Sequence, residues 1–356
     1  MFLPDWFPKF LPVFDPNKTY MDNAEFGPFF EGVFPERKHN KKQADFLGFP
    51  VASRLGVPAG PLLNSRWIVF AAKMGFDILT YKTIRSVSHP GHPLPNILYV
   101  QRQGDIALQM KDQPSNIDQL TITNSFGMPS RSPEFLLQDI ERANRSIGPN
   151  QIMIVSVTAT PSDGKSFLHD FIETASLAKN SGAKIIEANF SCPNVGKKEG
   201  CLYMSPDAVL EYASKLVNAI KPIPLILKVG KFQDEKQLQE VCVNAAKAGV
   251  RAISGLNSVS MRVVNDKKDP ALGRDRETSG ICGAGIRKDA LEFTKFAHKI
   301  IRKEKLDLIL MSVGGIVLPE HFTEFFEAGA DFALTATGMM WDPYLAFRYH
   351  NLKGHQ

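Results

Sequence analysis

The sequence predicts an α/β protein that folds as a closed (β/α)8 TIM barrel, with an N-terminal extension and a long excursion after the second strand. Three observations support this fold class. The chain has 356 residues, 44% of them hydrophobic, which is enough to bury one large core. Short, continuous apolar runs alternate with helical stretches, as in a parallel sheet covered by helices. Eight such runs occur, which is the number that closes this barrel.

The eight predicted strands follow one another between residues 51 and 336. We expect a helix after each of the first seven strands and the segment 341–349 after the last. The long excursion covers residues 84–151 and is rich in Pro, Gly and Asn, which favours loops and turns. The predicted strands are residues 51–57, 76–83, 152–158, 184–190, 224–229, 250–255, 307–313 and 332–336.

Residues 1–44 form the N-terminal extension, and residues 45–356 form the barrel domain. In the extension, prolines recur at every fourth position from residue 4 to residue 16, between phenylalanines and a tryptophan. Proline at this spacing forbids a regular helix. We therefore expect an extended aromatic strap packed on the barrel; the alternative is a surface that touches a membrane or a partner protein.

Composition excludes several classes of function. The formal net charge is +5, but the basic residues are scattered, with one cluster at 36–42, so no nucleic-acid surface is predicted. The four cysteines form no CxxC pair, which gives no signal for a zinc or iron–sulfur site. Cys242 and Cys282 lie in apolar surroundings and are expected to be reduced thiols of a cytoplasmic protein. No apolar run is long enough to predict a transmembrane segment.

Polar residues that suit chemistry follow the fourth predicted strand. Asn189, Cys192 and Asn194 lie where this strand gives way to its loop, the end at which such barrels place their active sites. A cysteine suits proton transfer because its pKa is close enough to neutrality to be tuned. An asparagine amide offers donors and an acceptor to a ring of alternating N–H and C=O groups. The alternative is a proline-terminated loop with a buried cysteine and two turn-forming asparagines.

Small residues follow the seventh and eighth predicted strands. Gly314-Gly315 and Ala336-Thr337 allow backbone N–H groups to approach an anion, and these two loops are the usual phosphate site of the barrel. The glycine-rich stretch 280–285 adds flexible backbone, or alternatively forms a disordered flap. Lys82 and Lys228 each end an apolar strand, and a buried ammonium needs a partner. A phosphate-bearing cofactor with an electron-accepting ring would supply one.

Taken together and in order along residues 45–350, these motifs resemble the dihydroorotate dehydrogenases, FMN-dependent (β/α)8 barrels of pyrimidine synthesis. The shared features are the strand-end lysines, Asn-Ser-x-Gly at 124–127, Asn-x-Ser-Cys-Pro-Asn at 189–194, Asn-Ser at 257–258 and the Gly-Gly turn. The resemblance implies oxidation of dihydroorotate to orotate, with a hydride passing from C6 to flavin N5 and a proton leaving C5. Cysteine at position 192 is similar to the soluble class, whereas the membrane-bound, quinone-using class has serine there.

The resemblance also assigns roles to individual residues. Cys192 would be the catalytic base, Lys82 would lie beside flavin and substrate, and Lys228 would lie at the flavin N1/O2 edge. The substrate-binding residues would be Asn124, Phe126, Gly127, Met128, Asn189, Asn194, Asn257 and Ser258. The FMN-binding residues would be Ala59, Gly60, Lys82, Thr83, Asn189, Lys228, Gly283, Gly314, Gly315, Ala336 and Thr337.

Two other functions stay open at this point. One is a flavoenzyme like dihydropyrimidine dehydrogenase, which reduces uracil or thymine with the same barrel and cysteine; the other is a flavin-binding barrel without turnover. The expected partner is a small-molecule substrate. The electron acceptor is left open between fumarate, a nicotinamide that acts through a separate reductase subunit, and a quinone. A homodimer and a peripheral membrane contact of the N-terminal extension are also left open.

Overall fold

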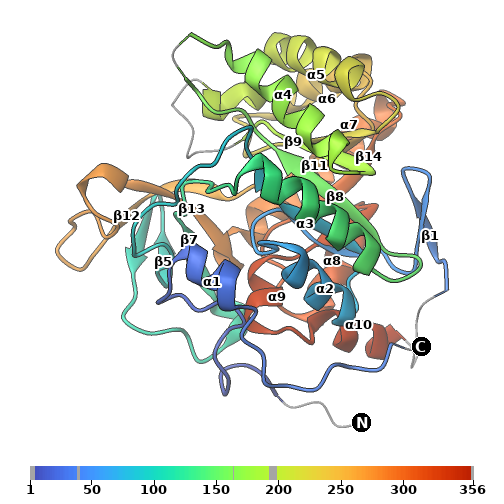
Figure 1. Ribbon diagram of the computed structural model, residues 1–356. Coiled ribbons are helices and arrows are strands. Elements are labelled where there is room, and N and C mark those ends of the chain that lie inside the picture. The colour runs from blue at the N-terminus through green and yellow to red at the C-terminus, as the bar shows by residue number, and fades with distance from the viewer. Residues whose placement is uncertain (1–4, 38–40, 163, 192–198, 354–356) are drawn as a thin grey trace.

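The computed structural model describes residues 5–37, 41–162, 164–191 and 199–353. Its centre is a closed barrel of eight parallel strands, which confirms the predicted (β/α)8 architecture (Figure 1). Every residue of the second and third barrel strands is buried, because helices cover the outside of the barrel and side chains fill its inside. The barrel strands are β3 (Leu55–Val57), β4 (Ile78–Ile84), β8 (Ile152–Val157), β9 (Ile185–Asn189), β10 (Leu225–Lys228), β11 (Ala252–Gly255), β14 (Ile309–Val313) and β15 (Phe332–Leu334).

Five of the described helices around the barrel follow residues whose side chains cap free backbone N–H groups. Asn64 caps the first barrel helix, and serines or an aspartate cap the next four. The predicted final segment 341–349 joins the end of one helix, at Trp341, to the start of another, at Leu345, and Pro343 lies between them. The helices around the barrel are α2 (Ser65–Lys73), α3 (Pro133–Ser146), α4 (Phe167–Asn180), α5 (Pro206–Ile220), α6 (Glu235–Lys247), α7 (Arg287–Lys303), α8 (Pro319–Glu327), α9 (Thr337–Trp341) and α10 (Leu345–Lys353).

The strand predicted at 51–57 is in fact two strands. Residue 51 ends a hairpin made of β1 (Ala44–Phe46) and β2 (Phe49–Val51), and the barrel strand begins four residues later. The hairpin turns at Leu47 and Gly48, both with positive φ, as a two-residue turn between twisted strands requires. Phe46 and Val51 are fully buried and pack with the barrel's interior side chains. The hairpin therefore closes the barrel end where the strands begin.

A five-stranded sheet stands beside the barrel and was not predicted. Its strand order is β5-β6-β12-β13-β7, so the excursion after β4 pairs with a segment more than a hundred residues later (Figure 1). Residues 280–285 end one of these strands and enter a 3-10 turn, which overturns the alternative of a disordered flap. The strands of this sheet are β5 (Val100–Gln103), β6 (Ile106–Gln109), β7 (Thr121–Asn124), β12 (Val259–Val264) and β13 (Thr278–Gly283). The described 3-10 turns are η1 (Ile117–Gln119), η2 (Glu199–Met204), η3 (Arg274–Arg276) and η4 (Ala284–Ile286).

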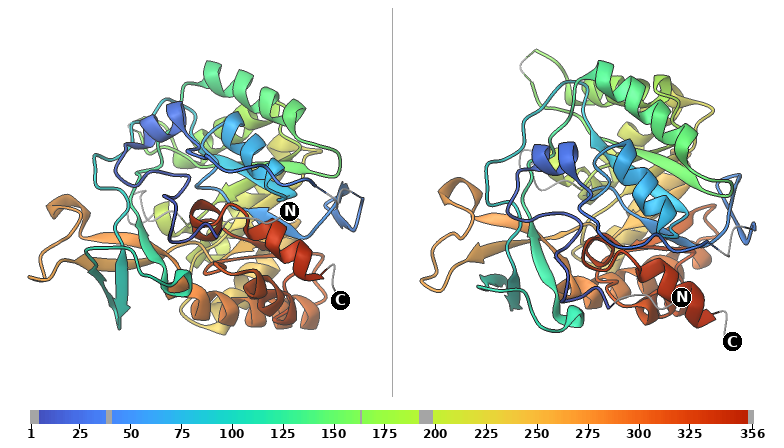
Figure 2. Two further views of the ribbon diagram at one scale, coloured as in Figure 1. Left: turned by 90° about the horizontal axis from the view of Figure 1, so that it is seen from below. Right: turned by 60° about the horizontal axis from the view of Figure 1, so that its bottom comes forward.

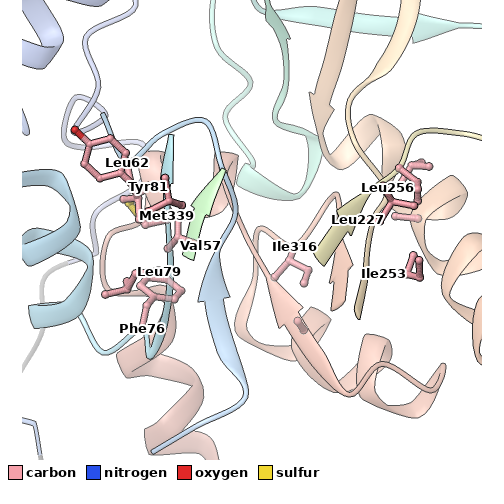
Figure 3. Packing of buried hydrophobic residues seen from close by; sticks show 14 of the residues in the cluster. Val57, Leu62, Phe76, Leu79, Tyr81, Leu227, Ile253, Leu256, Ile316 and Met339 are labelled. Carbon is pink, nitrogen blue, oxygen red and sulfur yellow. The ribbon is translucent and has the colours of Figure 1, made fainter. Parts of the chain in front are cut away.

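Side chains alternate between the outside and the inside of the barrel. Outward-facing residues such as Leu79, Leu227 and Ile253 belong to the large core shared with the helices (Figure 3). The inward-facing layer from alternate strands is apolar near the hairpin, but the next layer contains Thr80, Glu187 and Ser254. All three are fully buried, and their side-chain oxygens have no hydrogen-bond partner among the described residues. A polar layer therefore lies inside the barrel, beneath the strand ends.

The N-terminal segment, residues 5–37, packs against the barrel domain. Trp6 and Phe14 are each 2% exposed and belong to the large core, and the segment lies across α2 and the last two helices (Figure 2). The short helix α1 (Tyr20–Phe26) is held to α2, since the Asn64 side chain donates to the carbonyl of Ala24 at 2.7 Å. In the part of the chain that the structure describes, we found no helix long and apolar enough to cross a membrane.

Candidate active site

Two adjoining pockets lie at the carboxyl ends of the barrel strands. The first, here the glycine pocket, is lined by the loops after β14 and β15 and by residues around Gly283. The second, here the lysine pocket, is lined by Lys82, Thr83, Asn189 and Met128 among others. Residues that line both pockets, and so join them, are Ala59, Gly60, Asn124, Phe126, Lys228, Asn257 and Ser258. The structure thus brings together nearly all the described residues that the sequence proposed for the site.

The glycine pocket depends on residues that carry no side chain. Gly314 and Gly315 have φ of +123° and +79°, which side chains rarely allow. A Cβ on Gly315 would lie 2.5 Å from the Cα of Arg287, and one on Gly283 would lie 2.3 Å from the carbonyl oxygen of Leu120. Thr335 donates from its hydroxyl to the carbonyl of Ile316 at 2.6 Å, which ties the two loops together. Ala336 and Thr337 complete this wall at the start of α9.

Both strand-end lysines are buried in the site. Lys228 is 3% exposed, and its ammonium donates to the carbonyl of Ala59 at 3.4 Å. Lys82 is 7% exposed, and its ammonium donates to the carbonyl of Pro129 and lies 4.9 Å from the centre of the Tyr20 ring. Burying an ammonium is costly, so two buried lysines beside one pocket system indicate a binding site for negative charge.

Amide side chains converge on the lysine pocket from three strands. Asn189, 7% exposed at the end of β9, donates to the hydroxyl of Thr83 at 3.4 Å. Asn257 follows β11 and donates to the Ser191 hydroxyl at 2.9 Å and carbonyl at 3.1 Å. Its neighbour Ser258 lines both pockets and donates from its backbone N–H to Asn257 Oδ1 at 2.8 Å. Asn124 reaches the site from the other side, at the end of β7.

The loop 124–130, here the amide loop, forms one wall of the lysine pocket. Phe126 and Met128 line this pocket, and Arg85 fixes the loop by donating to the Met128 carbonyl at 3.0 Å. Gly127 lines neither pocket; its φ is +74°, and a Cβ there would lie 2.5 Å from the ring of His92. Its place in the structure is that of a turn residue that lets Phe126 and Met128 reach the pocket.

Comparison with known proteins relates this geometry to a reaction family. The family model described as dihydroorotate dehydrogenase matches residues 44–349. The chain belongs to the dihydroorotate dehydrogenase family. It is 48% identical to dihydroorotate dehydrogenase of Dictyostelium discoideum, over 96% of this chain and 97% of that protein.

More distant relatives differ in the electron acceptor that their names give. The catalytic subunit of dihydroorotate dehydrogenase B (NAD(+)) from Methanocaldococcus jannaschii is 23% identical, over 78% of this chain and 80% of that protein. Dihydroorotate dehydrogenase (quinone) from Mycolicibacterium smegmatis is 23% identical, over 81% of this chain and 73% of that protein. Dihydroorotate dehydrogenases are flavin-dependent oxidoreductases, and the pockets can be tested for their fit to a flavin.

The residues present fit a flavin nucleotide of the dihydroorotate dehydrogenases. Gly283, Gly314 and Gly315 line the glycine pocket without side chains, and their backbone packs so closely on Leu120, Ala290 and Arg287 that only glycine fits, which suits a wall of backbone groups for a phosphate. Lys228 stands between this wall and the lysine pocket, where it can hold negative charge on a ring. The glycine pocket is otherwise mostly apolar, with Ile122, Leu256 and other side chains available to pack on a planar group.

Sequence reasoning missed three residues that line the two pockets. Cys282, which we expected to be a core thiol, lines the glycine pocket near Asn124. Burial raises the pKa of its thiol to about 12, although the charge of Lys228 acts in the opposite direction. Phe14 and Tyr20 line the glycine and lysine pockets from the N-terminal segment. No periodicity in the sequence connects that segment with the strand ends.

Two of the predicted site residues, both in the motif at 189–194, lie outside the described residues. These are Cys192 and Asn194, so their roles stay predictions. The last described residue before this gap is Ser191, which is 4% exposed and accepts a hydrogen bond from the Asn257 side chain.

Proposed function

We propose that this chain binds FMN and oxidises dihydroorotate to orotate in pyrimidine synthesis. The observation that carries the proposal is the junction of a glycine-lined pocket and an amide-lined pocket at the buried Lys228. The first pocket suits a phosphate and a flat apolar group, and the second suits a small polar ring. Membership of the dihydroorotate dehydrogenase family supports the same reaction.

FMN would be held mainly by backbone groups. When bound, FMN supplies the ring that accepts a hydride from the substrate. Its phosphate would lie against the loops that carry Gly314, Gly315, Ala336 and Thr337, where the two glycines have no side chain. Lys228 would hold negative charge at the ring edge. The remaining walls of the two pockets would be completed by Ala59, Gly60, Thr83 and Gly283.

The substrate would occupy the lysine pocket. Dihydroorotate carries a ureide edge, which alternates donors and acceptors, and a carboxylate. Asn124, Asn189 and Asn257 offer donors and acceptors to the ureide edge, and Asn194 is proposed to join them. The ammonium of Lys82 would pair with the carboxylate, because it is buried at the same pocket. Cys192 would accept the proton from C5, as its position in the motif implies.

The proposal is tested by mixing the flavin-loaded protein with L-dihydroorotate without oxygen. We expect the flavin absorbance to bleach as orotate forms, and steady-state turnover with fumarate, NAD and a quinone analogue then identifies the electron acceptor. Flavin that is bleached by dihydrouracil and not by dihydroorotate would contradict the proposal in favour of a dihydropyrimidine dehydrogenase activity. Flavin that neither compound reduces would indicate a barrel that binds flavin without turnover.

Replacing Gly315 with valine should release most of the flavin. The new Cβ would lie 2.4 Å from the Arg287 Cβ and 2.8 Å from its backbone nitrogen, and a backbone atom cannot turn away as a side-chain end can. We expect FMN binding to weaken at least about tenfold, or about 1.4 kcal/mol. The matched control is Gly273→Val, since Gly273 also has positive φ, +100°, but a Cβ added there would have no atom within 4 Å. The flavin content per chain is measured for both variants after gel filtration. Full flavin content in Gly315→Val would contradict the assignment of the phosphate to this loop.

A further inference from the structure

The N-terminal segment contributes side chains to the site, although it precedes the barrel in the sequence. Tyr20 is the first residue of α1, and its side chain lines the lysine pocket together with Lys82, Asn124 and Asn189. It is 7% exposed. The family's shared motifs, which begin with the strand-end lysine Lys82, do not include this tyrosine.

Tyr20 contacts both a cation and the amide loop. The ammonium of Lys82 lies 4.9 Å from the centre of the Tyr20 ring, within the range of a cation–π interaction. The Phe126 ring packs edge-on against two rings of the N-terminal segment. Its centroid lies 5.9 Å from that of Tyr20, with 67° between the ring planes, and 5.5 Å from that of Phe14, with 68° between the planes. Two aromatic residues of the N-terminal segment therefore hold the amide loop, and one of them holds the lysine.

Tyr20 is fixed in place by its own helix. Thr19 and Asp22 form a capping box at the start of α1. Asn23 is fully buried, and its amide donates to the carbonyls of Asp15 at 3.0 Å and Thr19 at 3.0 Å. The indole of Trp67 on α2 donates to the Asn23 carbonyl at 3.2 Å. The ring thus presents a fixed face to Lys82.

The ring of Tyr20, and not its hydroxyl, carries these contacts. The hydroxyl has no hydrogen-bond partner among the described residues. Burial raises the pKa of this hydroxyl, so the group stays neutral and adds no charge to the pocket. A phenylalanine would keep the ring face that Lys82 contacts.

We propose that Tyr20 is a positioning residue of the substrate site, whose ring aims the Lys82 ammonium at the substrate carboxylate. This inference rests on the proposed function. The N-terminal segment then sets how strongly the site prefers a ring that carries a carboxylate over one that does not. The carboxylate-free analogue dihydrouracil makes no use of Lys82 and so depends less on Tyr20.

The test compares flavin-loaded wild type with Tyr20→Leu, Tyr20→Met and Tyr20→Phe. Leucine and methionine remove the ring, and methionine retains most of the volume should leucine impair folding. We expect either variant to weaken orotate binding, followed by the flavin spectrum, about tenfold. Their kcat/KM for dihydroorotate should fall by a similar factor, and their kcat/KM for dihydrouracil should fall by less than about threefold. Tyr20→Phe should restore values close to wild type.

The matched control is Phe26→Leu, at the other end of α1, where the side chain is 67% exposed. It should bind orotate as wild type does, with unchanged flavin content. Wild-type orotate affinity in Tyr20→Met would overturn the inference, as would equal losses for both substrates or failure of phenylalanine to restore affinity. A wild-type protein that keeps its flavin but neither binds orotate nor reacts with dihydroorotate would contradict the proposed function itself.

Discussion

Replacing Cys192 with alanine is expected to slow flavin reduction by dihydroorotate about a thousandfold. A positioned general base contributes between about 10² and 10⁴ in rate, and alanine cannot accept the proton from C5. Flavin content and orotate binding should stay close to wild type, because the pocket residues that hold both remain. Stopped-flow absorbance without oxygen measures the reduction step separately from binding.

Two further variants sharpen this experiment. Cys192→Ser should be slow and should accelerate as pH rises, since a hydroxyl loses its proton far less readily than a thiol. Cys201→Ala should behave nearly as wild type. Burial raises the pKa of the Cys282 thiol to about 12, which disfavours this thiol as a competing base. Reduction of Cys192→Ala at the wild-type rate would show that the base is another group.

Replacing Lys82 with methionine should abolish the preference for dihydroorotate over dihydrouracil. We expect the wild-type preference in kcat/KM to be at least about a hundredfold, at about 1.4 kcal/mol for each factor of ten. The Lys82 ammonium is buried at the lysine pocket beside the Pro129 carbonyl and the Tyr20 ring, where a substrate carboxylate would meet it.

Lys228→Met is the matched comparison for this prediction. Both lysines are buried at strand ends, but Lys228 also lines the glycine pocket, whereas Lys82 lines the lysine pocket alone. Losing Lys228 should therefore slow both substrates to a similar extent and weaken flavin binding. If Lys82→Met also slows both substrates equally, Lys82 acts on the flavin, and a dihydropyrimidine substrate becomes the better explanation.

The barrel was predictable because its strands are buried on both faces and begin as apolar runs. All residues of β4 and β9 are buried, so their runs are visible in the sequence without knowledge of their partners. The first strand was misjudged since Val51 is equally apolar in the hairpin and in a barrel strand. The five-stranded sheet was missed for the opposite reason. Strand β5 is mostly polar, and the pairing of β6 and β7 with the distant strands β12 and β13 leaves no local pattern in the sequence.

The site was predictable to the extent that its residues end barrel strands. Lys82, Asn189 and Lys228 each follow an apolar run, so the fold itself brings them to one end. Tyr20 and Cys282 follow no such run. Tyr20 belongs to a seven-residue helix in a proline-rich segment, and Cys282 lies in a strand of the second sheet. Only tertiary packing brings these two residues to the pockets.

The polar layer inside the barrel has a consequence for thermal resistance. Glu187 is fully buried, and neither of its carboxylate oxygens has a hydrogen-bond partner among the described residues. Such a group lowers the free energy of unfolding whether it is charged or protonated. Glu187→Met should therefore raise the melting temperature of the flavin-free protein by a few degrees, corresponding to roughly 1–2 kcal/mol. Glu187→Gln keeps a polar group in place, so its melting temperature should rise much less. A lower melting temperature in Glu187→Met would show that the carboxylate stabilises the flavin-free barrel.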